Sequence, residues 1–224
     1  MSYPRAGEPR PEALPPGQRT VGQLIAESIR LYGARFWATI PLGLPFVGLD
    51  VASFGHSVAV QTLLLWAFGP LLTAAYLYAC TLTSTERPTR RVLVSAYLAG
   101  LIVFLPFPVL LRLYVLPGTA LFGLLGLAVP AAVAEQLGVR AALRRGWQLG
   151  RADVVHAVGG MATLALVYGV SRYALLVLLH TQGSQAQNVA VVLADLVLSP
   201  LLYIGATLLY TDQAARVAGE PAHE

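Results

Sequence analysis

Apolar and polar residues alternate along this chain in long blocks. Apolar runs of roughly 18–28 residues are separated by short segments that hold most of the charged residues. A lipid bilayer needs about 20 apolar residues for each helical span, whereas a soluble domain has no use for so much continuous apolar sequence. The pattern predicts an all-α fold, a polytopic transmembrane helical bundle. The six expected spans are 36–54, 58–83, 92–112, 117–136, 153–180 and 188–211.

Prolines interrupt most of these expected spans. Membrane helices tolerate proline where neighbouring groups bond the freed carbonyl, so we expect kinked rather than missing helices. The competing interpretation is a four-span protein, in which the runs 36–54 and 92–112 only dip into the bilayer. The prolines concerned are Pro41, Pro45, Pro70, Pro106, Pro108, Pro130 and Pro200.

The segment 20–35, just before the first span, predicts an amphipathic helix. Thr20 and Gln23 fit a capping box, in which the hydroxyl accepts from a free amide and the glutamine bonds back. The apolar residues of the segment fall on one arc, and Glu27 and Arg30 lie opposite. We expect this helix to lie at the membrane interface.

The segment 138–151 predicts a second amphipathic helix with a strongly basic face. Trp147 borders its apolar arc, as suits an indole at the membrane–water interface. We expect an interfacial helix on the cytoplasmic leaflet, in contact with anionic phospholipid headgroups. The alternative is a solvated connector that only follows the positive-inside rule. The polar face carries Arg140, Arg144, Arg145 and Arg151.

The arginines indicate the orientation of the chain. With the N-terminus inside, thirteen of the fifteen fall in inner segments, Arg112 at an outer boundary and Arg172 within a span. Because cytoplasmic loops carry the excess of positive charge, an even number of spans places both termini in the cytoplasm. We expect a multi-pass protein of the bacterial cytoplasmic (inner) membrane.

The two ends of the chain differ from its middle. Residues 1–18 contain five prolines and predict a disordered cytoplasmic tail. No long apolar run precedes Phe36, so we expect no cleavable signal peptide. Residues 19–217 form the expected membrane domain, and 218–224 a short cytoplasmic C-terminal tail.

Composition supports lipid as the main solvent. The chain is 56% hydrophobic and 12% charged, where soluble domains carry about 25% charged residues. Its net charge is +4 and every basic residue is arginine, a bias typical of GC-rich bacterial genomes. Because the arginines flank apolar runs, we expect anionic lipid rather than nucleic acid as their partner. The lone cysteine, Cys80, excludes an internal disulfide, and we expect it to be buried.

Arg172 and Asp195 are the ionisable residues most notable for their position. Charges inside a span are costly and usually face the bundle interior or a partner. The two lie almost symmetrically about the loop at residues 183–184, so neighbouring spans present opposite charges at one depth. Three interpretations of these two residues are open: a structural ion pair, a transport or proton path, or no contact at all. Asp50 and Glu135 are expected to be span-boundary residues.

Signals for catalysis or cofactor binding are absent from the sequence. The histidines are scattered, with no two at a spacing of three or four residues that would favour a metal site. Motifs for zinc proteases, serine hydrolases and phosphate-binding loops do not occur. We therefore expect a non-enzymatic protein without catalytic residues, metal or cofactor. The four histidines are His56, His156, His180 and His223.

The second half of the chain resembles a known family. A proline and glutamate end one span at Pro130 and Glu135, an Ala-Leu-Arg-Arg-Gly-Trp helix follows, and the last span ends in Leu-Leu-Tyr-Thr-Asp near Arg216. This arrangement, clearest over 128–216, resembles the bacterial glycerophosphoryl diester phosphodiesterase membrane domain family. Gly146 stands where serine is usual. Because this chain lacks the phosphodiesterase domain fused in that family, the resemblance implies a multispan scaffold or partner, not hydrolysis.

Three functions remain open at this point. The leading hypothesis is a non-enzymatic scaffold or regulatory partner that binds another membrane protein through its arginine-rich helices. The alternative is a small-solute or ion transporter or channel that uses Arg172 and Asp195. An intramembrane enzyme acting on lipid ranks last. A tightly packed bundle would favour the scaffold, and a cavity that reaches Arg172 or Asp195 would favour transport.

Overall fold

The computed structural model describes residues 15–84, 86–113 and 115–219, and within these ranges the chain folds only into helices. Six helical segments of this part of the chain are long and apolar enough to cross a membrane, which confirms an all-α, multi-pass membrane protein. The last segment continues past the expected end of its span, into residues predicted as a tail. The six are Phe36–Ser53, Val58–Thr83, Arg90–Arg112, Val115–Ala134, Val154–Leu178 and Ser184–Gly219.

The predicted tails lie partly outside the described residues, which exclude 1–14 and 220–224. Residues 15–18 form a turn, in which the Gln18 amide donates to the Pro15 carbonyl at 3.2 Å. Gly17 has a φ of 90° and lies against Ala215 near the end of the last helix. This turn is therefore packed, contrary to the expectation that disorder extends to residue 18.

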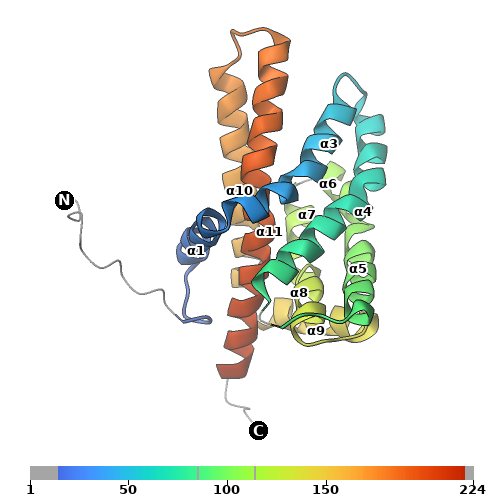
Figure 1. The fold of residues 1–224 in the computed structure, drawn as a ribbon, viewed down its shortest axis with the longest axis vertical. Helices are drawn as coiled ribbons and strands as arrows, with labels where there is room; N and C mark the ends of the chain where they lie inside the picture. The colour runs from blue at the N-terminus through green and yellow to red at the C-terminus, as the bar shows by residue number, and fades with distance from the viewer. Residues whose placement is uncertain (1–14, 85, 114, 220–224) are drawn as a thin grey trace, which may run out of the picture.

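Three spans are interrupted and three are continuous (Figure 1). The first span is α2 (Phe36–Thr39), η1 (Ile40–Gly43) and α3 (Leu44–Ser53). The third is α5 (Arg90–Phe104) and α6 (Phe107–Leu113), and the fourth is α7 (Val115–Leu125) and α8 (Ala128–Ala134). The continuous spans are α4 (Val58–Thr83), α10 (Val154–Leu178) and α11 (Ser184–Gly219), although α4 and α11 each contain a proline. The remaining helices are α1 (Val21–Ala34) and α9 (Val139–Ala152).

Side chains of α4 bond the carbonyls at two of the interruptions. Pro130 has no N–H to offer the Gly126 carbonyl four residues earlier, and the Tyr76 hydroxyl donates to that oxygen at 3.1 Å. Between α5 and α6, the Leu105 carbonyl accepts from the Trp66 indole N–H at 2.9 Å. The Gly126 carbonyl also accepts from the Val129 amide at 3.3 Å. In an apolar solvent such carbonyls need partners within the protein, and α4 supplies one at each break.

Small residues pack α9 across one end of the bundle, which we call the α9 end (Figure 1). A Cβ on Gly146 would lie 2.5 Å from the Ala128 nitrogen, and one on Gly150 would lie 2.5 Å from the Leu124 carbonyl oxygen. Only glycine allows this close approach of helix backbones. Nearly all of α8 is buried beneath α9. The opposite end, with the α3–α4 and α10–α11 connections, is the hairpin end.

The helix α1 has the predicted capping box and a buried face. The Thr20 hydroxyl accepts from the Gln23 amide at 3.3 Å, and the Thr20 amide donates to the Gln23 side chain at 2.8 Å. Leu24 is fully buried in a cluster with Leu209 of α11, so the apolar face of α1 packs on the bundle as well. On the outer face, a hydrogen bond from Arg30 lowers the pKa of the Glu27 carboxyl.

Candidate functional site

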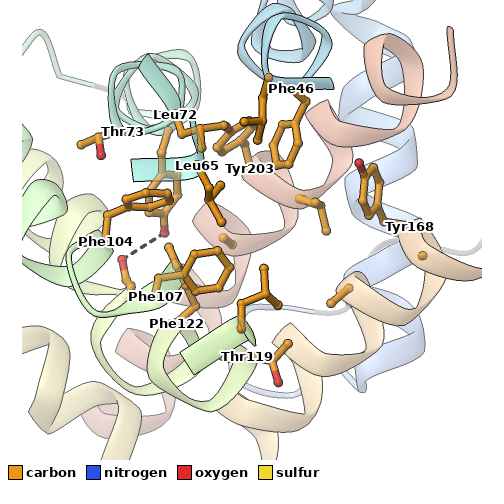
Figure 2. Close-up of a pocket in the computed structure, with 18 of the residues that line it drawn as sticks. Phe46, Leu65, Leu72, Thr73, Phe104, Phe107, Thr119, Phe122, Tyr168 and Tyr203 are labelled. Atoms are coloured by element: carbon orange, nitrogen blue, oxygen red, sulfur yellow. Dashed lines mark hydrogen bonds between the residues drawn. The ribbon is translucent and has the colours of Figure 1, made fainter. Parts of the chain in front are cut away.

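A cavity of about 700 Å³ lies at the centre of the bundle. Each of the six spans contributes residues to its wall (Figure 2). At the hairpin end the cavity reaches Phe54 and Gly55 in the α3–α4 connection, and at its other limit it meets Gly126 and Val129. Val129 belongs to the close-packed core of the α9 end. The bundle is therefore sealed at one end and hollow toward the other.

Aromatic rings form much of the cavity wall. Phe104, Phe107 and Phe122 make one group, with ring centroids 4.8–6.4 Å apart (Figure 2). A second group is a chain of neighbouring rings that ends beside the charged residues described next. The second group consists, in order, of Tyr76, Tyr203, Phe46 and Tyr168.

The charged part of the cavity wall centres on Arg172 of α10. Its guanidinium donates to the Asp50 carboxylate of α3 and, at 3.3 Å, to the Tyr168 hydroxyl. It also lies 3.7 Å from Asp195 of α11, whose other oxygen accepts from Tyr168 at 2.5 Å. The side chain of Asp195 is fully buried, while that of Arg172 is 30% exposed. We call these four residues the charged cluster.

The structure thus brings the two sequence-predicted charges together and adds a third. Arg172 and Asp195 are in ion-pair range, but the hydrogen-bonded partner of the arginine is Asp50. Asp50 lies near the end of the first span, as expected, and in addition its side chain reaches Arg172 of α10. Asp50 is the acidic residue of the first span, and that position was the available signal.

Glu135 directly follows the fourth span, as expected, and it also has two side-chain partners. It accepts from the Arg145 guanidinium at 2.8 and 3.0 Å and from the Tyr210 hydroxyl at 3.0 Å. Arg145 therefore points at the end of α8 rather than outward. The other predicted interface residues of α9 are exposed, and the Arg151 guanidinium lies 5.6 Å from the centre of the Trp147 ring. These exposed residues are Arg140, Arg144, Trp147 and Arg151.

A second ionic network joins the chain segments at the α9 end. Arg19 contacts Asp212 of α11 at 3.2 Å, and Arg216 contacts Asp153 at the start of α10 at 3.1 Å. His156 lies 3.9 Å from Asp212 and is also buried. Among the described residues, no group of three histidine, cysteine, aspartate or glutamate side chains is placed to hold a metal ion. The network fastens the segment before α1 to α10 and α11.

Three residues that carry the family resemblance meet in space, since Arg145 and Tyr210 both donate to Glu135. These contacts give the motif residues a structural role in holding α8, α9 and α11 together, and they assign no activity to the motif. No family model, curated protein or solved structure matches the chain.

Proposed function

We propose that this multi-pass membrane protein is a carrier, which binds a small and largely apolar molecule in its central cavity. The cavity of about 700 Å³ is the observation that supports it. Ligand sites typically measure about 300–1,000 Å³ and combine apolar walls with a few convergent polar groups. A scaffold has no need of such a space, and empty volume in a core lowers stability.

Two features support carriage in addition to binding. The cavity is closed at the α9 end and reaches the connection at the hairpin end, which is the shape of a carrier open to one face of the membrane. Interrupted helices beside a central site also recur in transporters, because broken segments can rearrange around a bound molecule. The proposed activity is movement of a molecule without a chemical step, so we assign no catalytic residue and no cofactor.

We further propose that the α9 end faces the cytoplasm of a bacterial inner membrane and contacts anionic phospholipid headgroups. The exposed basic residues of α9 and the positive-inside rule support this orientation. C-terminal fusions to a cytoplasmic fluorescent reporter and to a periplasmic phosphatase would test it, and activity of the phosphatase alone would reverse the orientation.

A scaffold or regulatory role remains the second candidate. The exposed Arg140, Arg144, Trp147 and Arg151 form a surface at the α9 end that a membrane-protein partner can contact. The proposed kinship with the phosphodiesterase membrane domain family points the same way. Both functions can coexist, because this surface and the cavity lie on different parts of the bundle.

The binding proposal can be tested with the full chain in detergent and a neutral apolar fluorophore such as N-phenyl-1-naphthylamine. Ala165 lines the cavity, whereas Ala174, on the same helix, is exposed. Ala165→Trp should fill the space and weaken saturable binding more than about tenfold, a change of about 1.4 kcal/mol in affinity. Ala174→Trp is the matched control and should bind as the unchanged protein does. Equal affinity of both variants would reject the cavity as a binding site.

Carriage itself can be tested by access from each face of the membrane. In a Cys80→Ser protein, a cysteine at Thr119 of the cavity wall should react with a membrane-impermeant maleimide from the hairpin face. Ligand binding should shift the reaction toward the other face, as alternating access requires. Labelling that stays confined to one face would reduce the proposal from a carrier to a receptor.

A further inference from the structure

We propose that the molecule bound in the cavity is a lipophilic monovalent cation, an amine or a quaternary ammonium or phosphonium group carried on an apolar body. The inference rests on the proposed binding function and adds the charge of the ligand to it. The charge of the cavity wall, the engagement of the arginine and the aromatic wall support it separately.

The first argument is the charge that the cavity wall presents to a ligand. Asp50 and Arg172 are the charged residues of the described cavity wall, and they form an ion pair. Asp195 is fully buried and does not line the cavity. The wall therefore has no surplus positive charge that would hold an anion, and Asp50 is the carboxylate that it offers to a cation.

The second argument is that Arg172 is already engaged. Its guanidinium donates to Asp50 and to the Tyr168 hydroxyl. An anionic ligand would have to displace Asp50 and leave that carboxylate unpaired in the wall of the cavity, at a cost typical of a broken buried pair. The cluster therefore discriminates against carboxylates and phosphates, although it contains an arginine.

The third argument is the aromatic wall. The faces of aromatic rings carry negative electrostatic potential and attract cations, including quaternary ones that cannot form hydrogen bonds. The Phe46 ring lies next to both Tyr203 and Tyr168, so a row of aromatic rings leads along the wall to the charged cluster (Figure 2). The Tyr203 hydroxyl is buried and has no hydrogen-bond partner in the described part of the chain, so its oxygen can accept from an ammonium group.

Two probes of nearly equal shape and opposite charge separate the possibilities. The full chain in detergent is titrated with tetraphenylphosphonium, with tetraphenylborate and with the neutral naphthylamine. We expect the phosphonium to bind at least about tenfold more tightly than the borate, a preference of about 1.4 kcal/mol. Equal binding of the two ions would overturn the inference and leave the cavity function standing. Failure of all three probes would overturn both.

Charge variants test whether the charged cluster causes the preference. Asp50→Asn should weaken phosphonium binding about tenfold and leave the neutral probe unaffected, since a unit charge at close range in a protein contributes at least that much. Glu86→Gln, at an exposed acid outside the spans, is the matched control. Gln61→Glu adds a carboxylate to the wall and should strengthen phosphonium binding. Unchanged phosphonium affinity in both wall variants would overturn the inference.

Discussion

The ion pairs around Arg172 allow a quantitative test of the charged cluster. Arg172→Ala removes a guanidinium that bonds to Asp50 and lies 3.7 Å from Asp195. The test compares the free energy of unfolding of this variant with those of the two aspartate-to-alanine variants and the two double variants. Coupling between Arg172 and Asp50 should exceed coupling between Arg172 and Asp195, because the first contact is hydrogen-bonded and the second is longer.

The magnitudes follow from burial. Removing one partner of a buried ion pair costs about 3–5 kcal/mol, because the other charge is left without compensation. Arg172 is 30% exposed, so water can replace part of the lost interaction and we expect a loss of about 2–3 kcal/mol. For a chain of this size that corresponds to a fall in Tm of about 5–10 °C. We expect the coupling energy to be about 1–2 kcal/mol with Asp50 and under about 1 kcal/mol with Asp195.

Cys80 provides the assay. It is the only cysteine of the chain and its side chain is buried, so a maleimide dye that fluoresces on reaction with thiols reports unfolding directly. Thermal scans in detergent of the single and double variants complete each cycle. Losses that add without coupling, within about 0.5 kcal/mol, would show that these charges do not interact and would refute the reasoning.

Three further predictions concern stability. The first two use the same scan, and the third uses tryptophan fluorescence, because thiols react too slowly with maleimides in acid. Tyr203→Phe should leave stability unchanged or raise it by up to about 1 kcal/mol, because it removes a buried hydroxyl without a hydrogen-bond partner. Tyr76→Phe should cost about 1 kcal/mol, because it removes the hydrogen bond to the Gly126 carbonyl. The reverse order of the two effects would contradict the assigned hydrogen bonds. Gly43→Ala should cost about 1–3 kcal/mol, since its Cβ would lie 2.5 Å from a backbone oxygen of α11, while Gly159→Ala, which meets nothing within 4 Å, should be neutral or stabilising. The lowered pKa of Glu27 means that its pairing stabilises the protein above the ordinary pKa of a glutamate and is lost as the pH falls through the lowered value. Glu27→Gln should therefore lower Tm by at most about 1 °C at neutral pH and leave it unchanged in acid.

The spans could be predicted from the sequence because the length of an apolar run is a local property. Expected and observed boundaries agree within a few residues, apart from the last helix, which begins at Ser184 and continues to Gly219. The capping box at Thr20 is equally local. Prolines predicted irregular helices, and the breaks near Pro106 and Pro130 lie where they are expected.

The cavity and its polar partners could not be predicted in this way. Arg172 and Asp50 are 122 positions apart, and their contact depends on how α3 and α10 are placed around α11, on which both pack. The symmetric positions of Arg172 and Asp195 in the α10–α11 hairpin predicted that these two charges meet, whereas nothing in the sequence linked Asp50 to them. Likewise, Glu135 meets Arg145 only because α9 folds back across the end of α8. Empty space between helices depends on side-chain volumes from every span, for which a single sequence has no periodic signal.

The two hydrogen bonds from α4 also divide the bundle mechanically. Trp66 and Tyr76 attach α4 to the breaks in two neighbouring spans, so a displacement of α4 along its axis would break both hydrogen bonds and leave the Leu105 carbonyl without a partner. We expect α4 to α8 to move as one block. The helix α1, which packs on both α10 and α11, would have to move with that hairpin in any opening of the sealed end.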